Sequence, residues 1–420
     1  MEKGILVIGC GSLVANDINI ALRDISGYKL YGASDKKNHG EYVYKNYISD
    51  IPNIKNNNFI EILNKKIDMY NIKFIIPTHE DLALYLQENK NKIKATVVCS
   101  EYNTAFLCRY KTKTYEKLEK YDFVPKTYKK EEVKSFPVFV KKDNDQGGRH
   151  AYKVNNQEEL DLYAKDDMVI CEFLPGEEVT VDCFTNRKGN LLFCNSRVAD
   201  RMLAGIDVHA RRVKSKEINE IALNINKEIK FRGFWFFQVK KDTNGKYKLL
   251  EISTRLPGAF SLSRCLDVNL PLLAIKDFAG EDVKISFNDI DIEADKQFLG
   301  KYKLDINYNT VFLDIDSCII KTNNINTLLI MYLYQCVNKN INIIGLTSNY
   351  RETIEELKKC KVSDKLFNDI IENKNIENIE FYNNSIYISN EENYRIYVRE
   401  NKKICSFSNN IIECLLDWRA

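Results

Sequence analysis

Residues 136–150 have the sequence FPVFVKKDNDQGGRH, and this stretch indicates how the middle of the chain folds. Its apolar first half predicts a short strand ending at Lys141, and the part from Asp143 to His150 is rich in turn-forming residues. A further short strand, AYKV, follows directly at 151–154. Because short strands joined by glycine-containing turns are typical of antiparallel sheets, we expect the middle of the chain to form one.

More apolar strands of this kind follow, down to residue 253. A helix at 218–229 interrupts them, and another is predicted at 111–121. Asn244-Gly245 favours a tight turn, so the strands on either side of it should form a hairpin. The predicted strands cover residues 168–174, 177–186, 189–199, 233–241 and 247–253.

The first hundred residues instead alternate strand and helix, which implies parallel β-α-β units and a small three-layer α/β domain. The first strand ends at Gly9-Cys10-Gly11. A glycine-rich turn there can hold a phosphate or simply reverse the chain, and Val14 occupies the place of the third glycine in the dinucleotide pattern. The predicted strands cover 4–10, 29–35, 73–78 and 95–100, and the helices 16–23, 59–70 and 82–87.

The composition changes near residue 300. All seven prolines lie before it, and Gly345 is the only glycine after Gly300. Beyond a polar stretch, apolar strands again alternate with helices, which predicts a separate α/β domain of about 110 residues. Its strands are expected at 310–316, 341–349, 385–389 and 403–408.

Composition excludes several classes of protein. The formal charge of +3 over 420 residues gives no reason to expect nucleic acid or an anionic membrane as partner. The N-terminus lacks the apolar core of a signal peptide, and the apolar stretch 328–337 is too short to span a bilayer. The twelve cysteines contain no C-x-x-C pair, so we expect reduced thiols in a soluble, cytoplasmic protein.

An ordered set of polar residues supplies every group that ATP binding needs. ATP requires cations near its phosphates, backbone N–H groups over the β and γ oxygens, acceptors for the ribose hydroxyls, and oxygen ligands for Mg²⁺. In chain order the candidates are Lys111, Lys141, the loop 143–150, Glu172, Glu178, Gln238, Glu251 and Arg255.

These segments resemble the ATP-grasp superfamily, in particular the branch similar to the large subunit of carbamoyl-phosphate synthase. IKFIIPTHEDL (72–82) is similar to the strand and loop that face the active site, and FVKKDNDQGGRH (139–150) to the lysine strand and phosphate loop. ICEFLPGEEVTVD (170–182) resembles the adenine hinge, and LLEISTRLPGAFSLSRCLDVNLP (249–271) the metal strand and following loop. The resemblance covers roughly residues 1–290 and implies ATP and Mg²⁺ as cofactors.

The resemblance also implies a role for each nucleotide-binding residue. Lys111 and Lys141 would contact the ATP phosphates, below a phosphate loop that contains Gly147 and Gly148. Glu178 would bind the ribose hydroxyls. The residues that would line the adenine, largely through their backbone, are Glu172, Phe173 and Leu174.

Gln238 and Glu251 would bind Mg²⁺ in this scheme. Glu251 lies in an apolar strand, where an unpaired carboxylate is costly and a metal ion is the easier explanation. The third metal position, usually asparagine in this family, is Ser253. The residues implied to act in catalysis are Arg255, Lys141 and Arg197.

Substrate recognition is expected in the arginine-rich segment 196–213, because guanidinium groups suit a bidentate grip on a carboxylate. Arg197 matches an arginine of the related ligases. The other candidates, which are also compatible with solvated loop charges, are Arg201, His209, Arg211 and Arg212.

The C-terminal domain resembles the haloacid dehalogenase (HAD) fold. Asp314 and Asp316 end its first strand and Thr347-Ser348 its second, and the resemblance implies a phosphoryl-accepting nucleophile and a general acid/base for the two aspartates. Lys374 is a candidate for the required lysine. Where a late acidic pair would bind Mg²⁺, the chain has Ser389-Asn390. Two hypotheses remain open: a degenerate domain used for docking or regulation, and an active phosphatase.

We therefore expect a multidomain chain of α/β and α+β type. It would comprise a preATP-grasp three-layer α/β domain (1–108), an ATP-grasp domain of two α+β subdomains (109–295, nucleotide lid about 115–180), and a HAD-like Rossmannoid domain (309–420). The expected activity is an ATP-dependent carboxylate–amine ligase that activates the carboxylate as an acyl phosphate. The alternatives are a non-catalytic ATP-binding sensor or scaffold, and a bifunctional protein with phosphatase activity.

The expected partners are a small-molecule carboxylate and an amine, with no nucleic acid and no membrane. The chain could also form a homo-oligomer.

Overall fold

The computed structural model describes residues 2–145, 150–203, 206–296, 302, 304–320, 325–373 and 375–417. The chain divides into two compact units, Met1–Phe298 and Leu299–Ala420, and the change of composition near residue 300 falls at this division. Gly147 and Gly148 of the expected phosphate loop lie outside the described residues, as does Lys374.

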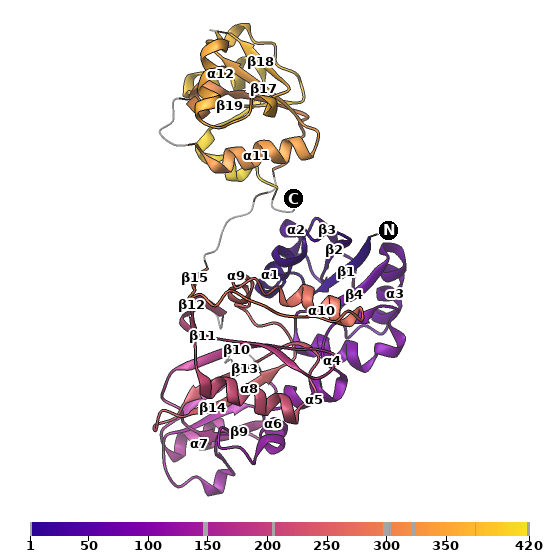
Figure 1. Cartoon of the computed structure of the whole chain (residues 1–420), viewed down its shortest axis with the longest axis vertical. Helices are drawn as coiled ribbons and strands as arrows, with labels where there is room; N and C mark the ends of the chain where they lie inside the picture. The colour runs from indigo at the N-terminus through magenta and orange to yellow at the C-terminus, as the bar shows by residue number, and fades with distance from the viewer. Residues whose placement is uncertain are drawn as a thin grey trace. The chain divides into compact units, whose positions relative to one another are not determined.

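A five-stranded parallel sheet forms the N-terminal part of the first unit, in the order β3-β2-β1-β4-β5 (Figure 1). Ile5 and Val7 of β1 pack in one core cluster with Ile18 of α1, whereas Leu6 packs on the other face with Leu63 of α3. Helices therefore cover both faces, and the predicted three-layer arrangement is confirmed. Its elements are β1 (Lys3–Ile8), α1 (Leu13–Leu22), β2 (Tyr28–Ala33), α2 (Gly40–Val43), β3 (Asn46–Ile48), α3 (Phe59–Tyr70), β4 (Ile72–Pro77), α4 (Glu80–Glu88) and β5 (Thr96–Val97).

The turn after β1 is built around Gly9. Gly9 has φ +82°, and a Cβ atom at this position would lie 2.3 Å from Thr78 Oγ1, so only glycine fits. Helix α1 then begins at Leu13, three residues before the predicted start, because the Ser12 hydroxyl accepts a hydrogen bond from the Ala15 N–H at 3.2 Å and caps it.

A small antiparallel sheet follows, in the order β6-β9-β7-β8. Val138 and Val140 of β7 pack with Leu160 of α7 and Ile170 of β9. Ahead of it in the chain, α6 ends at Leu118 rather than at the predicted residue 121. The elements are α5 (Tyr102–Arg109), α6 (Lys111–Leu118), β6 (Thr127–Tyr128), β7 (Val138–Lys142), β8 (Ala151–Val154), α7 (Gln157–Tyr163) and β9 (Met168–Glu172).

The remaining strands of the first unit form a second, larger antiparallel sheet, in the order β14-β13-β10-β11-β12-β15. The predicted hairpin is confirmed: β13 and β14 are antiparallel neighbours, and Gly245 between them has φ +79°. Ile221 of α8 packs with Trp235 and Phe237 on one face of this sheet. The elements are β10 (Glu178–Thr185), β11 (Leu191–Leu203), β12 (Ile206–Val213), α8 (Lys216–Glu228), β13 (Gly233–Lys241), β14 (Tyr247–Ser253), α9 (Ser261–Cys265), α10 (Leu270–Phe278) and β15 (Glu293–Asp295).

One hydrophobic cluster joins the parallel sheet to this large sheet. Ile5 of β1, Phe184 of β10, Phe234 of β13 and Ile275 of α10 all belong to it. The parallel sheet and the large antiparallel sheet therefore share a core, which fixes the carboxyl ends of β1 and β4 relative to the large sheet.

The second unit contains a five-stranded parallel sheet in the order β18-β17-β16-β19-β20, which confirms the predicted α/β pattern. Leu313 of β16 packs with Leu333 of α11, and Phe312 packs in a separate cluster with Val398. Its elements are β16 (Thr310–Asp314), α11 (Thr327–Asn338), β17 (Asn342–Thr347), α12 (Tyr350–Lys359), β18 (Asp369–Glu372), β19 (Ser385–Ile388), α13 (Glu392–Tyr397) and β20 (Cys405–Phe407).

Among the described residues, the helices are all too short or too polar to cross a bilayer.

Candidate active site

A cleft of about 550 Å³ lies in the first unit, between the parallel sheet and the two antiparallel sheets. The N-terminal part contributes Ser12, Val14, Thr78 and His79 to its wall. Residues 257 and 258 close it after β14. The predicted site residues that line it are Lys111, Lys141, Glu172, Phe173, Leu174, Glu178, Arg197, Gln238, Glu251 and Arg255.

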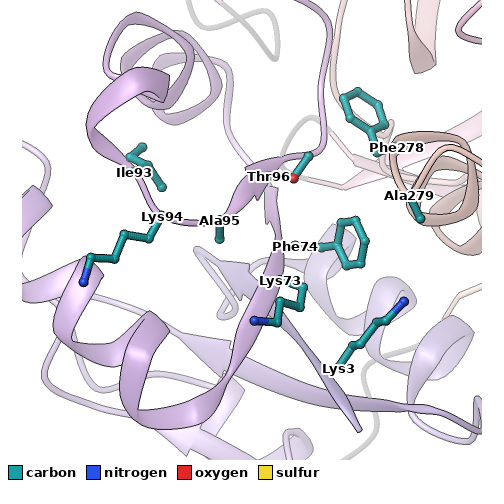
Figure 2. A pocket seen from close by; sticks show the side chains of 9 residues that line it. All are labelled: Lys3, Lys73, Phe74, Ile93, Lys94, Ala95, Thr96, Phe278 and Ala279. Atoms are coloured by element: carbon teal, nitrogen blue, oxygen red, sulfur yellow. The ribbon is translucent and has the colours of Figure 1, made fainter. Parts of the chain in front are cut away.

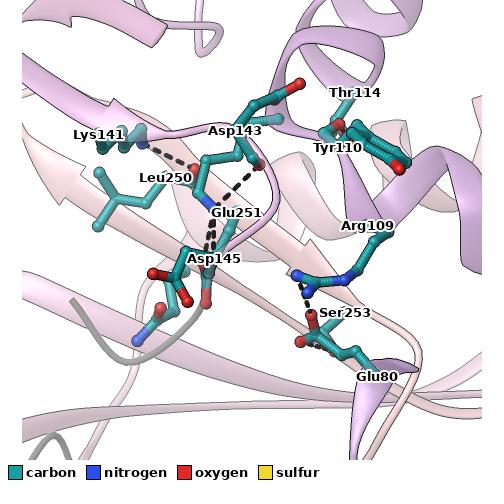
Figure 3. A network of polar contacts seen from close by, with 12 residues as sticks. Glu80, Arg109, Tyr110, Thr114, Lys141, Asp143, Asp145, Leu250, Glu251 and Ser253 are labelled. Carbon is teal, nitrogen blue, oxygen red and sulfur yellow. Dashed lines mark hydrogen bonds and ion pairs between the residues drawn. The ribbon is translucent and has the colours of Figure 1, made fainter. Parts of the chain in front are cut away.

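Lys141 is a buried cation at the end of β7, with only 7% of its surface exposed. Its ammonium group donates a hydrogen bond to the Tyr115 hydroxyl at 2.8 Å. It also donates to the Leu250 carbonyl oxygen at 3.0 Å (Figure 3). In the part of the chain that the structure describes, no carboxylate lies within ion-pair distance of it. Because a buried charge needs compensation, Lys141 is suited to an anionic ligand.

Lys111, the first residue of α6, is the second buried cation of the cleft. Its ammonium group lies 3.5 Å from a carboxylate oxygen of Glu251 and donates to the Asp145 carbonyl at 2.8 Å. Burial lowers the pKa of Lys111, Glu251 raises it, and the nearby charge of Lys141 lowers it again. The charge of Lys111 is therefore partly compensated by the Glu251 carboxylate, whereas Lys141 has no carboxylate partner among the described residues.

The start of the loop at 143 is anchored to α6. The Asp143 carboxylate accepts hydrogen bonds from the N–H and the hydroxyl of Thr112, both at 2.8 Å. A carboxylate at a helix N-terminus is favourable because it satisfies an otherwise unpaired donor there. This anchor brings the end of β7 next to Lys111.

Gln238 and Glu251 lie directly opposite one another in the β13–β14 pair. The Gln238 amide nitrogen donates to Glu178 at 3.2 Å and to Thr180 at 3.1 Å. In the described structure its carbonyl oxygen accepts no hydrogen bond. A carboxylate and an amide oxygen fit Mg²⁺, which takes one or two protein ligands and fills its other positions with phosphate oxygens and water. The described residues contain no group of three His, Cys, Asp or Glu side chains placed around a metal.

Part of the cleft wall is apolar. The apolar side chains that line it include Phe139, Cys171, Leu174 and Leu250. The Glu172 carboxylate accepts a hydrogen bond from the Lys126 N–H at 2.8 Å, which ties the strand after β9 to the chain before β6. Backbone and apolar groups thus remain to contact a planar ligand, as expected for an adenine.

Glu178, the first residue of β10, lines the same cleft. Its carboxylate accepts a hydrogen bond from the Gln238 amide at 3.2 Å, and the Lys240 ammonium lies 3.6 Å from it. Its role as the ribose-binding residue stays a prediction.

Ser253, the expected third metal position, does not line the cleft; it is buried and donates its hydroxyl to the Glu80 carboxylate at 2.8 Å. Glu80 also lies 3.3 Å from Arg109 and 3.4 Å from the Arg255 Nε atom. Figure 3 shows Glu80 between Arg109 and Ser253. The structure thus assigns the Ser253 hydroxyl a partner in α4.

Arg197 lines the cleft although its side chain is fully buried. It forms an ion pair with the buried Asp182, whose second oxygen accepts a hydrogen bond from Ser263 at 2.7 Å. This network orients the guanidinium group from behind.

The other basic residues of segment 196–213 are not among the residues that line the cleft. The described residues of this segment belong to β11 and β12, which pair as antiparallel neighbours, and their basic side chains pair with acidic neighbours. Arg201 pairs with Asp295, His209 with Glu293, Arg211 with Glu177, and Arg212 with Asp289.

His79 is a cleft residue that the sequence analysis did not name. It precedes α4 at the carboxyl end of β4, within the segment already expected to face the active site. Burial lowers its pKa, and the charge of Arg255 lowers it further. A neutral imidazole is therefore favoured here. Other lining residues that the sequence analysis did not name singly are Ser12, Thr78, Met202, Pro257 and Gly258. Thr78, Pro257 and Gly258 lie in segments 72–82 and 249–271, which were already expected at the site, and Met202 of β11 lies in segment 196–213.

A second hollow lies near the amino ends of β1 and β4 (Figure 2). Phe74, Phe278 and three lysines line it, and one of them, Lys94, is paired with Asp68. Ligands of parallel sheets bind at the carboxyl ends of the strands. This hollow is at the opposite edge of the sheet and holds none of the predicted site residues.

In the second unit, the four predicted residues lie at the carboxyl edge of the parallel sheet. Asp316 accepts hydrogen bonds from the Thr347 hydroxyl at 2.8 Å and from the N–H and hydroxyl of Ser348 at 2.8 and 2.7 Å. Asp314 accepts from the hydroxyls of Ser317 at 2.7 Å and Ser389 at 2.6 Å. The structure therefore joins Asp316, Thr347 and Ser348 in one hydrogen-bonded group, whereas Asp314 belongs to another group with Ser317 and Ser389.

This arrangement does not fit Mg²⁺. One Asp314 oxygen is held by two hydroxyl donors, and Ser389 occupies the end of β19 where a metal-binding carboxylate would be needed. The Asn390 amide donates to the Ser317 carbonyl at 2.8 Å. The cluster thus offers two carboxylates, each already hydrogen-bonded, and no third acidic ligand among the described residues.

The first unit has the ATP-grasp fold. Residues 164–298 match the model of a family described as ATP-grasp in the biosynthetic pathway with Ter operon. The matched range contains all strands of the large antiparallel sheet. It includes the cleft residues Glu178, Gln238, Glu251 and Arg255. No curated protein matches the chain.

Solved structures support the same fold. Biotin carboxylase from Campylobacter jejuni, in complex with an ATP analogue, superposes with a TM-score of 0.56 and 16% identity, over 68% of this chain and 72% of that one. The biotin carboxylase domain of 2-oxoglutarate carboxylase from Hydrogenobacter thermophilus, with MgADP and bicarbonate, gives 0.56 and 17% over 69% and 72%. N5-carboxyaminoimidazole synthetase from Staphylococcus aureus, with ADP, gives 0.55 and 17% over 69% and 80%.

Proposed function

We propose that the first unit is an ATP-dependent carboxylate–amine ligase that activates its substrate as an acyl phosphate. The observation that carries the proposal is the buried Lys141 ammonium, which has only neutral hydrogen-bond partners in the described structure. It shares a cleft with a Gln–Glu pair suited to Mg²⁺ and with an apolar wall suited to adenine. Three similar structures contain ATP analogues or ADP, which supports the same nucleotide here.

In this proposal Lys111 and Lys141 hold the phosphates of ATP, and Gly147 and Gly148 belong to the loop that covers them. Glu178 binds the ribose. The adenine lies against Glu172, Phe173 and Leu174. Gln238 and Glu251 would hold Mg²⁺, which would neutralise charge on the phosphates. Ser253, on the same strand as Glu251, stabilises β14 through its hydrogen bond to Glu80.

The first chemical step is transfer of the γ-phosphoryl group. A carboxylate oxygen of the substrate forms a bond to the γ-phosphorus, the bond from this phosphorus to the bridging oxygen breaks, and ADP leaves. Lys141 and Arg255 stabilise the charge on the transferring group, and Arg197 holds the carboxylate. A neutral amine then attacks the acyl carbon, phosphate leaves, and the nitrogen loses a proton to give the amide.

The proposed domains support this chemistry. We propose that residues 1–108 and 109–295 are the preATP-grasp and ATP-grasp domains, and that about 115–180 forms the nucleotide lid. The small sheet β6-β9-β7-β8 lies within this lid and contributes Phe139 and Lys141 to the cleft. A lid that excludes water protects an acyl phosphate from hydrolysis. We also propose a cytoplasmic location, where ATP is available.

The test is a coupled ADP-release assay with Mg²⁺, ATP and pooled carboxylates and amines. The ligase proposal predicts ADP release that requires one carboxylate, followed by a product whose mass equals carboxylate plus amine minus water. If ATP binds but ADP release stays at background with every pool, the ligase proposal is wrong.

The alternative is a non-catalytic ATP sensor or scaffold. The Ser253–Glu80 hydrogen bond favours it, because the third metal position is then occupied by a protein contact. Tight MgATP binding without turnover would support this alternative, and substrate-dependent ADP release would exclude it.

A second activity, hydrolysis of a phosphate ester by a HAD-like domain at 309–420, is favoured by the position of Asp314, Asp316, Thr347 and Ser348 at the carboxyl ends of the neighbouring strands β16 and β17. The hydroxyl of Ser389, which holds Asp314 where a second metal-binding carboxylate would be expected, favours the docking or regulatory hypothesis instead. Phosphatase activity that disappears in Asp314→Asn would support the second activity.

A further inference from the structure

Glu80 lies where three segments of the first unit meet. It is the first residue of α4, Arg109 is the last residue of α5, and Ser253 ends β14. The Glu80 side chain is only 13% exposed, and Arg109 is 11% exposed. A carboxylate so enclosed must be fully hydrogen-bonded or paired to be tolerated.

Each oxygen of Glu80 has a different task. One oxygen faces the Nη1 atom of Arg109 at 3.3 Å, and Arg109 is in turn held by Asp81 at 2.8 Å. The other oxygen accepts the Ser253 hydroxyl at 2.8 Å and lies 3.4 Å from the Nε atom of Arg255. Arg109 and Ser253 therefore leave Glu80 little freedom to move away from Arg255.

Arg255 is restrained on several sides. Its guanidinium group lies over the Phe236 ring, 5.1 Å from the centroid, and its Nη1 atom donates to the Leu256 carbonyl at 3.0 Å. The Glu80 contact is at Nε, the nitrogen nearest the chain. Because a guanidinium is planar, a contact at Nε together with one ring face fixes the direction of the terminal nitrogens.

We propose that Glu80 is a positioning residue for Arg255: it holds the guanidinium ready for the charge that develops on the transferred phosphoryl group. The inference rests on the proposed ligase function. It makes the segment after β4 part of the phosphoryl-transfer machinery, although Glu80 does not itself line the cleft. The proposal requires that the effect of Glu80 on the transferred phosphoryl group pass through Arg255, so removing Glu80 should lower the gain only when Arg255 is present.

The experiment measures binding of MgADP alone and of MgADP with aluminium fluoride, a planar mimic of the transferring phosphoryl group. The variants are Glu80→Gln, Glu80→Asp, Arg255→Ala, and Arg255→Ala combined with Glu80→Gln. Asp81→Asn is the matched control, because Asp81 neighbours Glu80 and contacts Arg109 but is far more exposed. Thermal unfolding shows whether each variant is folded.

We expect wild type to bind MgADP more tightly when aluminium fluoride is present. Glu80→Gln should bind MgADP within about threefold of wild type but lose about tenfold or more of the fluoride-dependent gain, because it removes the charge that orients Arg255. Glu80→Asp should recover part of the gain, and Asp81→Asn should keep all of it. In the Arg255→Ala background, Glu80→Gln should cause no further loss.

Two failures are distinguishable. If wild type does not bind MgADP, or gains nothing from aluminium fluoride, the proposed ligase function is wrong and the inference falls with it. If wild type shows the gain and Glu80→Gln keeps it, or if the losses from Glu80→Gln and Arg255→Ala simply add, Glu80 does not act through Arg255. Should Glu80→Gln fail to fold, Glu80→Asp in the two Arg255 backgrounds decides the same question.

Discussion

The ammonium group of Lys141 lies 3.0 Å from the carbonyl oxygen of Leu250, the residue immediately before Glu251. Lys141 belongs to the small antiparallel sheet and Leu250 to the large one, so this contact joins the proposed lid to the strand proposed to hold Mg²⁺. A phosphate bound between them would replace neutral acceptors of the lysine with a charged one. Charge-assisted hydrogen bonds of this kind are roughly twice as strong as neutral ones.

Lys141→Met is therefore expected to weaken ATP binding by about 10- to 100-fold, the equivalent of one hydrogen bond to a charged group. The substitution should not lower the thermal midpoint by more than a few degrees, because it removes a buried charge that has no anionic partner in the described structure. Isothermal titration calorimetry and thermal unfolding measure the two effects. Lys134→Met, at an exposed position, should change neither.

Glu251→Gln should raise the Mg²⁺ concentration needed for tight ATP binding, because an amide oxygen is a weaker ligand than a carboxylate. ATP affinity measured against a Mg²⁺ series would show the shift. Ser253→Ala tests the third position: with its hydroxyl held by Glu80, it should leave the Mg²⁺ requirement unchanged. A shift as large as that of Glu251→Gln would instead make Ser253 a ligand.

His79 should make the protein less stable in mild acid. Burial lowers its pKa below the ordinary value of 6.5, so the folded state favours the neutral ring. The contribution of His79 to the free energy of unfolding is fully present above pH 6.5. It is lost as the pH falls through the lowered pKa of the folded state, because in this range the unfolded state binds more protons than the folded state. His79→Gln should reduce the slope of unfolding free energy against pH below 6.5. Equal slopes for the two proteins would contradict the prediction.

Gly9→Ala should destabilise the first unit more than Gly27→Ala. Both glycines have positive φ, +82° and +84°, and in each case an alanine in the left-handed region costs about 1–2 kcal/mol. At Gly27 a Cβ meets nothing within 4 Å, whereas at Gly9 it would lie 2.3 Å from Thr78 Oγ1. The difference in unfolding free energy between the two variants measures the cost of the steric clash between a Cβ at position 9 and Thr78. If the two values were equal, the close approach to Thr78 would not matter.

Much of the fold could be predicted from local pattern. The period of apolar residues and the position of glycine indicated the parallel strands near the N-terminus, the Asn244-Gly245 hairpin and the change of domain near residue 300. These features depend on neighbours in the chain, so they are visible without the tertiary structure. Local pattern predicted a single antiparallel sheet, and only the family resemblance implied two α+β subdomains. Which strands belong to which sheet was not predicted, because pairing partners such as β6 and β9 are distant in sequence.

Some residues of the candidate site could be predicted from the sequence, and others could not. Residues such as Lys141, Gln238 and Glu251 were identified from their order and their places on strands, and they line one cleft. His79 and Glu80 were missed because histidine and glutamate after a strand are common. Only the tertiary structure distinguishes them: Glu80 lies 3.4 Å from the Arg255 Nε atom, and the charge of Arg255 lowers the pKa of His79.

The sequence by itself determined which segments are strands and helices, and which side chains at their ends can bind phosphate or metal, because both follow from local residue type and spacing. Only the tertiary structure decided which of these groups are already paired. Arg197 is held by the buried Asp182, Ser253 by Glu80, and Asp314 by Ser389. Such pairing depends on burial and on contacts between distant segments, and the energetic cost of leaving a buried polar group unpaired arises only once the chain has folded.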